Sequence, residues 1–146
     1  MKFSGTVEIA APRDAVFAFV TDPTRVATCG PGVESVEVVD ETHFRVKAKV
    51  GVGFIKAHFL IEMHLAHLEP PETAWITGRG HAPGSAVDGS ARMRLRELAP
   101  DRTAMEWESD VNIAGTLASV GARLIEGSAR KMIDQTFDCI RAKVEG

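Results

Sequence analysis

The chain has 146 residues, the length of one domain of ordinary size. Its composition, 45% hydrophobic and 25% charged, is that of an average globular protein. A net charge of -3 and the lack of a long basic run argue against a nucleic-acid partner. The N-terminus lacks the apolar core of a signal peptide, and no run approaches the ~18 apolar residues of a membrane span. We therefore expect a cytoplasmic protein with at most peripheral membrane contact.

The cysteines and histidines give no strong sign of a metal or redox centre. Cys29 and Cys139 lie far apart without CxxC spacing, so we expect two free thiols in a reducing compartment. His64 and His67 are three residues apart on a predicted strand and should point to opposite faces. We therefore expect no metal site and no covalently or metal-bound cofactor.

The first third of the chain predicts one strand and two short helices. Residues 2–10 alternate between apolar and polar side chains, the period of a half-buried strand. Pro12 suits the first turn of a helix, and Asp22-Pro23 ends that helix. Residues 23–29 could form a second short helix, followed by a turn at Gly30-Pro31-Gly32.

Residues 33–113 predict six further strands, because apolar side chains recur at every second position between turn-forming residues. The segment from Phe44 to Val50 is the clearest example. The glycines of Gly51-Val52-Gly53 indicate a bulge or bend in a curved sheet. Consecutive strands joined by short turns should pair as antiparallel neighbours.

The periodicity changes at Gly115. From Leu117 to Val144 apolar residues recur at three- and four-residue steps, which predicts one continuous helix of roughly 28 residues, about 40 Å long. Only this helix is large enough to cover a sheet face. We predict a single α+β domain, residues 1–146, in which a seven-stranded curved antiparallel sheet wraps around the long helix.

The predicted inner face of the sheet is apolar and carries no Asp, Glu, His or Lys. Small residues such as Ala48, Ala91 and Gly121 interrupt the larger ones, which fits either ordinary packing or a ligand cavity. Catalysis usually needs titratable groups with tuned environments, and none is predicted inside. Three acidic residues of one strand and three arginines of another should instead form a charge ladder on the outer face: Glu106, Glu108 and Asp110 opposite Arg92, Arg94 and Arg96.

Several segments, in order, resemble the CoxG family of proteins associated with carbon monoxide dehydrogenase. The strongest runs from Val111 to Ile125 and reads as a strand ending in Gly, then Leu-Ala, Gly and Arg-Leu-Ile. The bends at 49–59 and 78–91 also fit the family pattern. The resemblance implies the helix-grip fold shared with START-type lipid carriers and polyketide cyclases, with a cavity between sheet and helix. It further implies a role beside molybdenum hydroxylases of the carbon monoxide dehydrogenase type.

The leading hypothesis is therefore a non-catalytic binding protein for a hydrophobic molecule such as an isoprenoid quinone or another lipid. The partner expected is a molybdenum hydroxylase complex, which the protein would help to mature, to recruit to the inner face of the membrane or to supply with quinone. The predicted ligand contacts are Val16, Phe19, Phe59, Met63, Met93, Met105, Trp107, Ser109, Leu117, Val120, Gly121, Leu124 and Ile125.

Three polar residues are candidate partners for a ligand headgroup: Ser109, Ser128 and Arg79. Two alternatives stay open. A cyclase- or hydratase-type enzyme acting in the same cavity would need Arg79, His81 or Glu97 to point inside. A purely interacting assembly factor would have a closed interior, with less than the ~300 Å³ that a drug-sized ligand needs.

Overall fold

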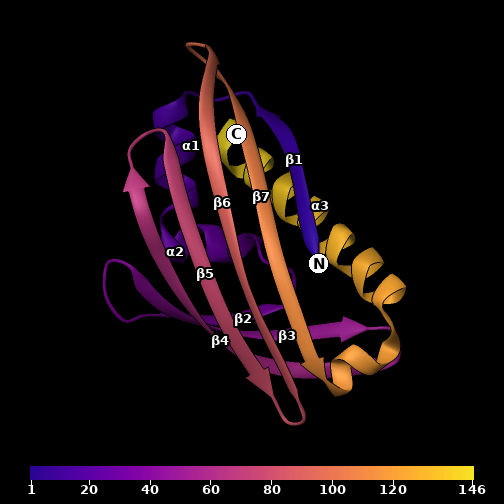
Figure 1. Cartoon of the computed structure of the whole chain (residues 1–146). Helices are drawn as coiled ribbons and strands as arrows, with labels where there is room; N and C mark the ends of the chain where they lie inside the picture. Colours follow the sequence, from indigo (N-terminus) through magenta and orange to yellow (C-terminus); the bar gives the residue numbers. More distant parts are fainter.

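The computed structural model describes all 146 residues, as one sheet with helices on one side (Figure 1). The chain begins with strand β1 and passes through three short helices before the remaining strands. The elements are β1 (Lys2–Ile9), α1 (Arg13–Val20), α2 (Pro23–Val26), the 3-10 helix η1 (Ala27–Cys29), β2 (Val33–Val38), β3 (His43–Val52), β4 (Ile55–Glu69), β5 (Thr73–Ala82), β6 (Ser85–Ala99), β7 (Arg102–Gly115), the 3-10 helix η2 (Thr116–Val120) and α3 (Ala122–Glu145).

The seven strands form one antiparallel sheet in the order β1-β7-β6-β5-β4-β3-β2. Strands β2 to β7 pair with their neighbours in sequence, and β1 closes the sheet beside β7. Figure 1 shows β2 and β3 swung away from the direction of β5 to β7, so that the sheet curves around α3. The predicted fold is confirmed, including the short helices after the first strand.

The register confirms the outer charge ladder except at Asp110, which lies opposite Ser90 and is 3.7 Å from the N-terminal amine of Met1. Arg92 lies opposite Glu108 and Arg94 opposite Glu106 on neighbouring strands β6 and β7. Arg92 forms an ion pair with Glu108, and Arg96 reaches Glu106 at 3.4 Å. These side chains are about half exposed, so each pair contributes little to stability.

The glycines near residue 52 differ from the prediction of a bulge or bend. Gly53 lies in the turn of a two-stranded hairpin, because β3 ends at Val52 and β4 begins at Ile55, whereas Gly51 lies within β3 opposite Lys56. Gly53 has φ of +60°, which a residue without Cβ adopts at little cost. Gly53 therefore serves the tight turn of the hairpin and not a gradual bend of the sheet.

The predicted continuous C-terminal helix is interrupted. Residues Thr116–Val120 form a 3-10 helix, and the α-helix begins only at Ala122. Gly121 between them has φ of +100° and ψ of 147°, a conformation outside any right-handed helix. Since an apolar period of three to four residues fits both helix types, it could not reveal this break. No helix is both long and apolar enough to span a membrane.

The prediction of two free thiols is wrong, because Cys29 and Cys139 are joined by a disulfide. Their Cα atoms lie 5.4 Å apart, although 110 residues separate them in sequence. The bond ties η1 to the C-terminal half of α3. No short-range spacing announces such a pair, since only the fold brings the two segments together.

The hydrophobic core is divided into three clusters. The largest joins α1, β1 and the C-terminal half of α3 around Ile9, Val16 and Leu95. A second lies around Val52, Leu117 and Ile125, where the β3–β4 hairpin meets the start of α3. The third lies on β3 and β4 and centres on Phe44. The middle of the concave sheet face lies between these clusters.

Candidate ligand-binding site

The concave face of the sheet is apolar over its whole width. Strand pairing places Met63 beside Phe44 and Gly78, Ala91 beside Ile76, and Ser109 beside Ala91. Polar atoms enter this face through the hydroxyls of Ser85, Thr103 and Ser109 and through the indole N–H of Trp107. The Ser85 hydroxyl accepts a hydrogen bond from the backbone N–H of Leu117, and the Thr103 hydroxyl donates one to the carbonyl of Ala11. The inward positions predicted from alternation are confirmed by this register: Phe44, Val46, Ala48, Phe59, Ile61, Met63, Leu65, Ala91, Met93, Leu95, Met105, Trp107 and Val111.

The residues at the centre of this face are half-buried and belong to none of the three core clusters. Ala91 and Val111 on the sheet, with Met132 on α3, belong to none of the three clusters and remain partly accessible. Close-packed interiors rarely leave such a group of apolar residues accessible. This band is the part of the concave face best suited to an apolar ligand.

Glycines on the concave face let large side chains lie flat across the sheet. The Met63 sulfur would lie only 2.9 Å from a Cβ placed on Gly78. The Trp107 ring would lie 3.2 Å from a Cβ on Gly5. Side chains at both glycines would therefore force Met63 and Trp107 to move. The glycines thus leave the space that these two side chains occupy on the concave face.

Trp107 places a polar indole N–H on the largely apolar inner face. Its Nε1 is buried and has no hydrogen-bond partner, an arrangement that costs free energy. The ring packs against Phe137 of α3 with centroids 5.2 Å apart. A hollow of about 260 Å³ opens here between β1 and α3, lined also by Arg130 and Ile133.

The predicted contact residues fall into three groups. Six are buried within the core clusters: Val16, Phe19, Phe59, Met105, Leu117 and Ile125. Five are half-buried: Met63, Met93, Trp107, Ser109 and Val120. Two are exposed: Gly121 and Leu124. The hollow beside Trp107 is lined by residues 130–137 in the middle of α3, whereas the ligand wall predicted from the sequence lay in residues 117–125.

The three polar candidates separate in the same way. Ser109 lies on the concave face, and Ser128 is half-buried on α3. The suggestion that Arg79 binds a headgroup inside is wrong, because its register places it between Glu62 and Asp88 on the outer face. His81 is exposed on that outer face, and Glu97 is exposed near the end of β6. None of these three side chains, Arg79, His81 and Glu97, is buried on the concave face.

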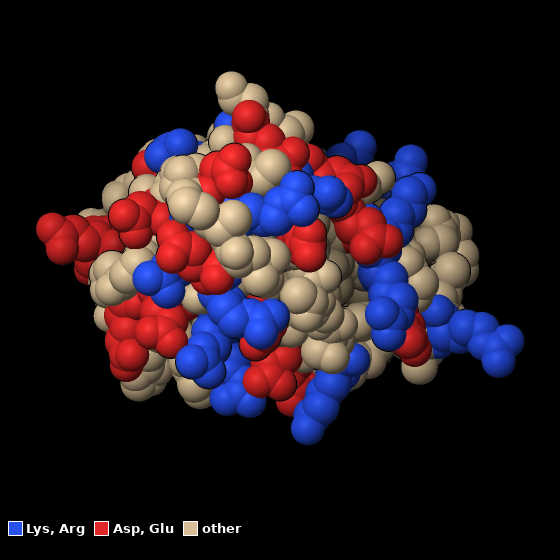
Figure 2. All heavy atoms as spheres, turned by 90° about the horizontal axis from the view of Figure 1, so that it is seen from above, with Lys and Arg blue, Asp and Glu red and all other residues tan.

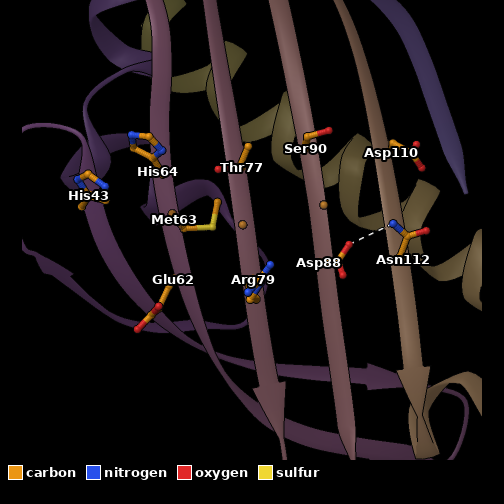
Figure 3. A pocket seen from close by; sticks show the side chains of 12 residues that line it. His43, Glu62, Met63, His64, Thr77, Arg79, Asp88, Ser90, Asp110 and Asn112 are labelled. Carbon is orange, nitrogen blue, oxygen red and sulfur yellow. Dashed lines mark hydrogen bonds between the residues drawn. The ribbon is translucent and has the colours of Figure 1, made fainter.

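The outer face carries a larger, polar hollow of about 580 Å³ across strands β3 to β7 (Figure 3). His43 stacks on His64 at its edge with ring centroids 4.2 Å apart, and Asn112 donates a 3.1 Å hydrogen bond to Asp88. The structure brings no three metal-ligating side chains together. Sequence alternation placed most of these residues outside, but only the strand register shows that they meet.

Two carboxyl groups have a clearly lowered pKa, and both lie in surface turns. The Thr24 hydroxyl lowers the pKa of Asp22 by hydrogen bonding to it. The backbone N–H of Thr42 and the His43 side chain lower the pKa of Asp40 to about 2. Both shifts belong to local turn and helix-capping geometry rather than to the concave face.

Comparison with known families agrees with this architecture. The CoxG family model, which describes the G component of carbon monoxide dehydrogenase, matches residues 5–145. The chain belongs to the CoxG family. A comparison with curated proteins found no match.

Solved structures share the fold of this CoxG family member at low sequence identity. A conserved protein from Geobacillus kaustophilus has a TM-score of 0.92 at 19% identity, covering 99% of this chain and 95% of that one. The ZhuI aromatase/cyclase from Streptomyces sp. R1128 has 0.74 at 19%, covering 99% and 93%. A START superfamily protein from Mycobacterium smegmatis has 0.73 at 15%, covering 99% and 97%. The chain therefore has the helix-grip fold of START- and cyclase-like proteins.

Proposed function

We propose that this protein binds a hydrophobic small molecule, with an isoprenoid quinone as the leading ligand, and performs no catalysis itself. Membership of the CoxG family supports an accessory role for a molybdenum hydroxylase of the carbon monoxide dehydrogenase type. In this proposal the protein works in the cytoplasm and reaches the inner face of the membrane together with its partner.

The apolar concave face is the observation that carries the proposal. From Ser85 to Leu95 on β6, and from Met105 to Ile113 on β7, no inward position bears a charged side chain. Such a surface binds by burying apolar area, at about 25 cal/mol per Å². Its sheet residues offer no group that could act as a general acid or base, although Asp134 of α3 lines the adjoining hollow beside Trp107.

A quinone or lipid headgroup also needs hydrogen-bond partners. Our candidates are the Ser109 hydroxyl, opposite Ala91 of the half-buried band, and the half-buried Ser128 hydroxyl on α3. The hollow beside Trp107, at about 260 Å³, is slightly smaller than the ~300 Å³ expected of a drug-sized site. The ligand in our proposal therefore also occupies the band around Ala91 and Val111, with a small outward shift of α3.

Ligand extraction tests this function directly. Protein purified under mild conditions should release a quinone or lipid into organic solvent, and native mass spectrometry should show the same mass bound. Added short-chain quinone should quench Trp107 fluorescence in a Trp75→Phe background, because Trp75 lies on the outer face and would otherwise dominate the signal. Absence of both bound lipid and quenching would leave the assembly-factor alternative.

A cyclase- or hydratase-type activity is the second candidate. It is favoured by the fold shared with an aromatase/cyclase and with a norcoclaurine synthase from Thalictrum flavum, at 19% and 13% identity. That likeness concerns the fold alone, and fold does not determine function. Turnover of a bound hydrophobic substrate by the purified chain would favour this candidate over the binding role.

A further inference from the structure

The tip of the β3–β4 hairpin presents the most exposed large apolar side chain of the protein. Phe54 is 88% exposed, whereas its neighbour Val52 is buried in a core cluster. The tip rests on the start of α3, since a Cβ on Gly53 would lie 2.8 Å from Leu124 Cδ2. The hairpin therefore packs against the core through Val52 and against α3 through Gly53, and Phe54 projects outward from it.

Leu124 extends this apolar surface onto α3. It is 43% exposed and borders a shallow hollow of about 490 Å³ with Val120, Gly127 and Ser128. Leu124, Gly127 and Ser128 are spaced by three and four residues, so they share one face of the start of α3, and Val120 lies beside them at the end of η2. Phe54 and Leu124 together form one convex apolar point with a shallow floor beside it.

Basic side chains surround this point without acidic partners. Lys49 and Lys56 lie on the hairpin, and Arg123 and Lys131 line the hollow on α3. None of the four has a carboxylate within ion-pair distance, whereas nearby Glu126 is paired with Arg130. In Figure 2 the side chains that project furthest at the right, the side on which Figure 1 shows the start of α3, are basic.

The tip of the β6–β7 hairpin provides an internal contrast. Leu98 there is 43% exposed, but its neighbours include Glu97 and Asp101. The arginines flanking that tip are already paired, Arg96 with Glu106 and Arg102 with Glu8. Exposure of an apolar residue at a hairpin tip is thus not enough to create a basic apolar surface in this protein.

We infer that the Phe54 tip and its basic surround dock onto an anionic lipid surface. Each basic residue near such a surface contributes about 1 kcal/mol, and an inserted aromatic side chain adds apolar burial. A stable protein interface would need ~1,000 Å² of complementary surface, far more than one projecting side chain offers. This inference rests on the part of the proposed function that brings the protein to the membrane, and it names the surface that makes the contact. Docking requires no bound ligand, so the vesicle test and the ligand-extraction test can fail separately.

Vesicle flotation with the full chain tests this surface. The protein should bind phosphatidylcholine vesicles that contain about one third phosphatidylglycerol, and binding should weaken on adding salt. Phe54→Ser should reduce the partition coefficient at least tenfold, on the order expected for an inserted aromatic ring. Lys56→Gln or Arg123→Gln should reduce it about fivefold on anionic vesicles only.

Leu98→Ser is the matched control and should leave vesicle binding unchanged. All four positions are exposed, so thermal unfolding should confirm that every variant keeps its fold. Failure of the wild-type chain to bind anionic vesicles would overturn the inference, as would equal binding by Phe54→Ser. Neither result affects the extraction test, which measures what the concave face holds.

Discussion

The two faces of the sheet use the same seven strands but differ in almost every physical respect. The outer face carries ion pairs such as Arg92–Glu108, the His43–His64 stack and a polar hollow. The concave face carries apolar side chains, glycines and one unpartnered indole N–H. The comparison teaches that the larger hollow need not be the one suited to an apolar ligand. The apolar side chains of the inner face, rather than the volume of a hollow, make that face the better fit for an apolar ligand.

The covalent tie between η1 and α3 should have the largest effect on this arrangement. Replacing Cys29 and Cys139 by Ala, or reducing the bond, should lower the free energy of unfolding by about 3 to 5 kcal/mol, because the bond closes a loop of more than a hundred residues. Denaturant unfolding with and without a dithiol reductant measures this. An unchanged unfolding midpoint would mean that the disulfide does not stabilise the packing of α3 over the inner face.

Adjacent residues on β6 should show the contrast between the faces most sharply. Leu95→Ala should cost about 3 kcal/mol of unfolding free energy, because Leu95 is fully buried in the largest cluster. Arg94→Ala should cost less than about 1 kcal/mol, because its ion pair with Glu72 is exposed. Equal losses in denaturant titrations would contradict the assignment of the two faces.

Crowding of the concave face should have an intermediate effect. Gly80→Ala should lower the free energy of unfolding by about 1 to 2 kcal/mol, since its Cβ would lie 3.0 Å from both Ile61 and Val87 side-chain carbons. His81→Ala on the outer face is the matched control, expected within about 0.5 kcal/mol of wild type. A Gly80→Ala variant as stable as this control would show that the inner face is loosely packed there.

A small pH effect should arise at the turn around Asp40. Its folded pKa of about 2 lies below the usual value, so its stabilising contribution is present above about pH 4 and is lost as the pH falls toward 2. Nuclear magnetic resonance titration should place its midpoint near 2. Asp40→Asn should remove this part of the acid dependence of unfolding. A midpoint close to the ordinary value of about 4 would mean that the Thr42 and His43 contacts do not persist in solution.

Alternation along the chain was enough to predict the sheet and its inner face. The strict period of two in residues 44–50 and 91–95 leaves each residue only one face to occupy. Pairing between distant segments was beyond such reasoning, because the Cys29–Cys139 bond depends on how η1 meets α3. The break at Gly121 was also missed, since apolar spacing does not report backbone dihedral angles.

The candidate site was predictable in character but less so in position. Apolar inward strands indicated an apolar ligand, and Met63, Met93 and Trp107 lie on the half-buried concave face. Several other predicted contacts, such as Val16 and Ile125, are buried in core clusters instead. Burial depends on how α1 and α3 are seated over the sheet, which the one-dimensional pattern does not specify.

Occupancy of the concave face by an apolar ligand is the central claim, and one pair of neighbouring substitutions tests it most directly. Ala91→Phe fills the half-buried band, whereas Ser90→Phe adds the same ring to the outer face. Native mass spectrometry should show ligand bound to the wild type and to Ser90→Phe but not to Ala91→Phe, with all three folded. Equal ligand occupancy in Ala91→Phe and Ser90→Phe would contradict the claim that the ligand lies between the sheet and α3.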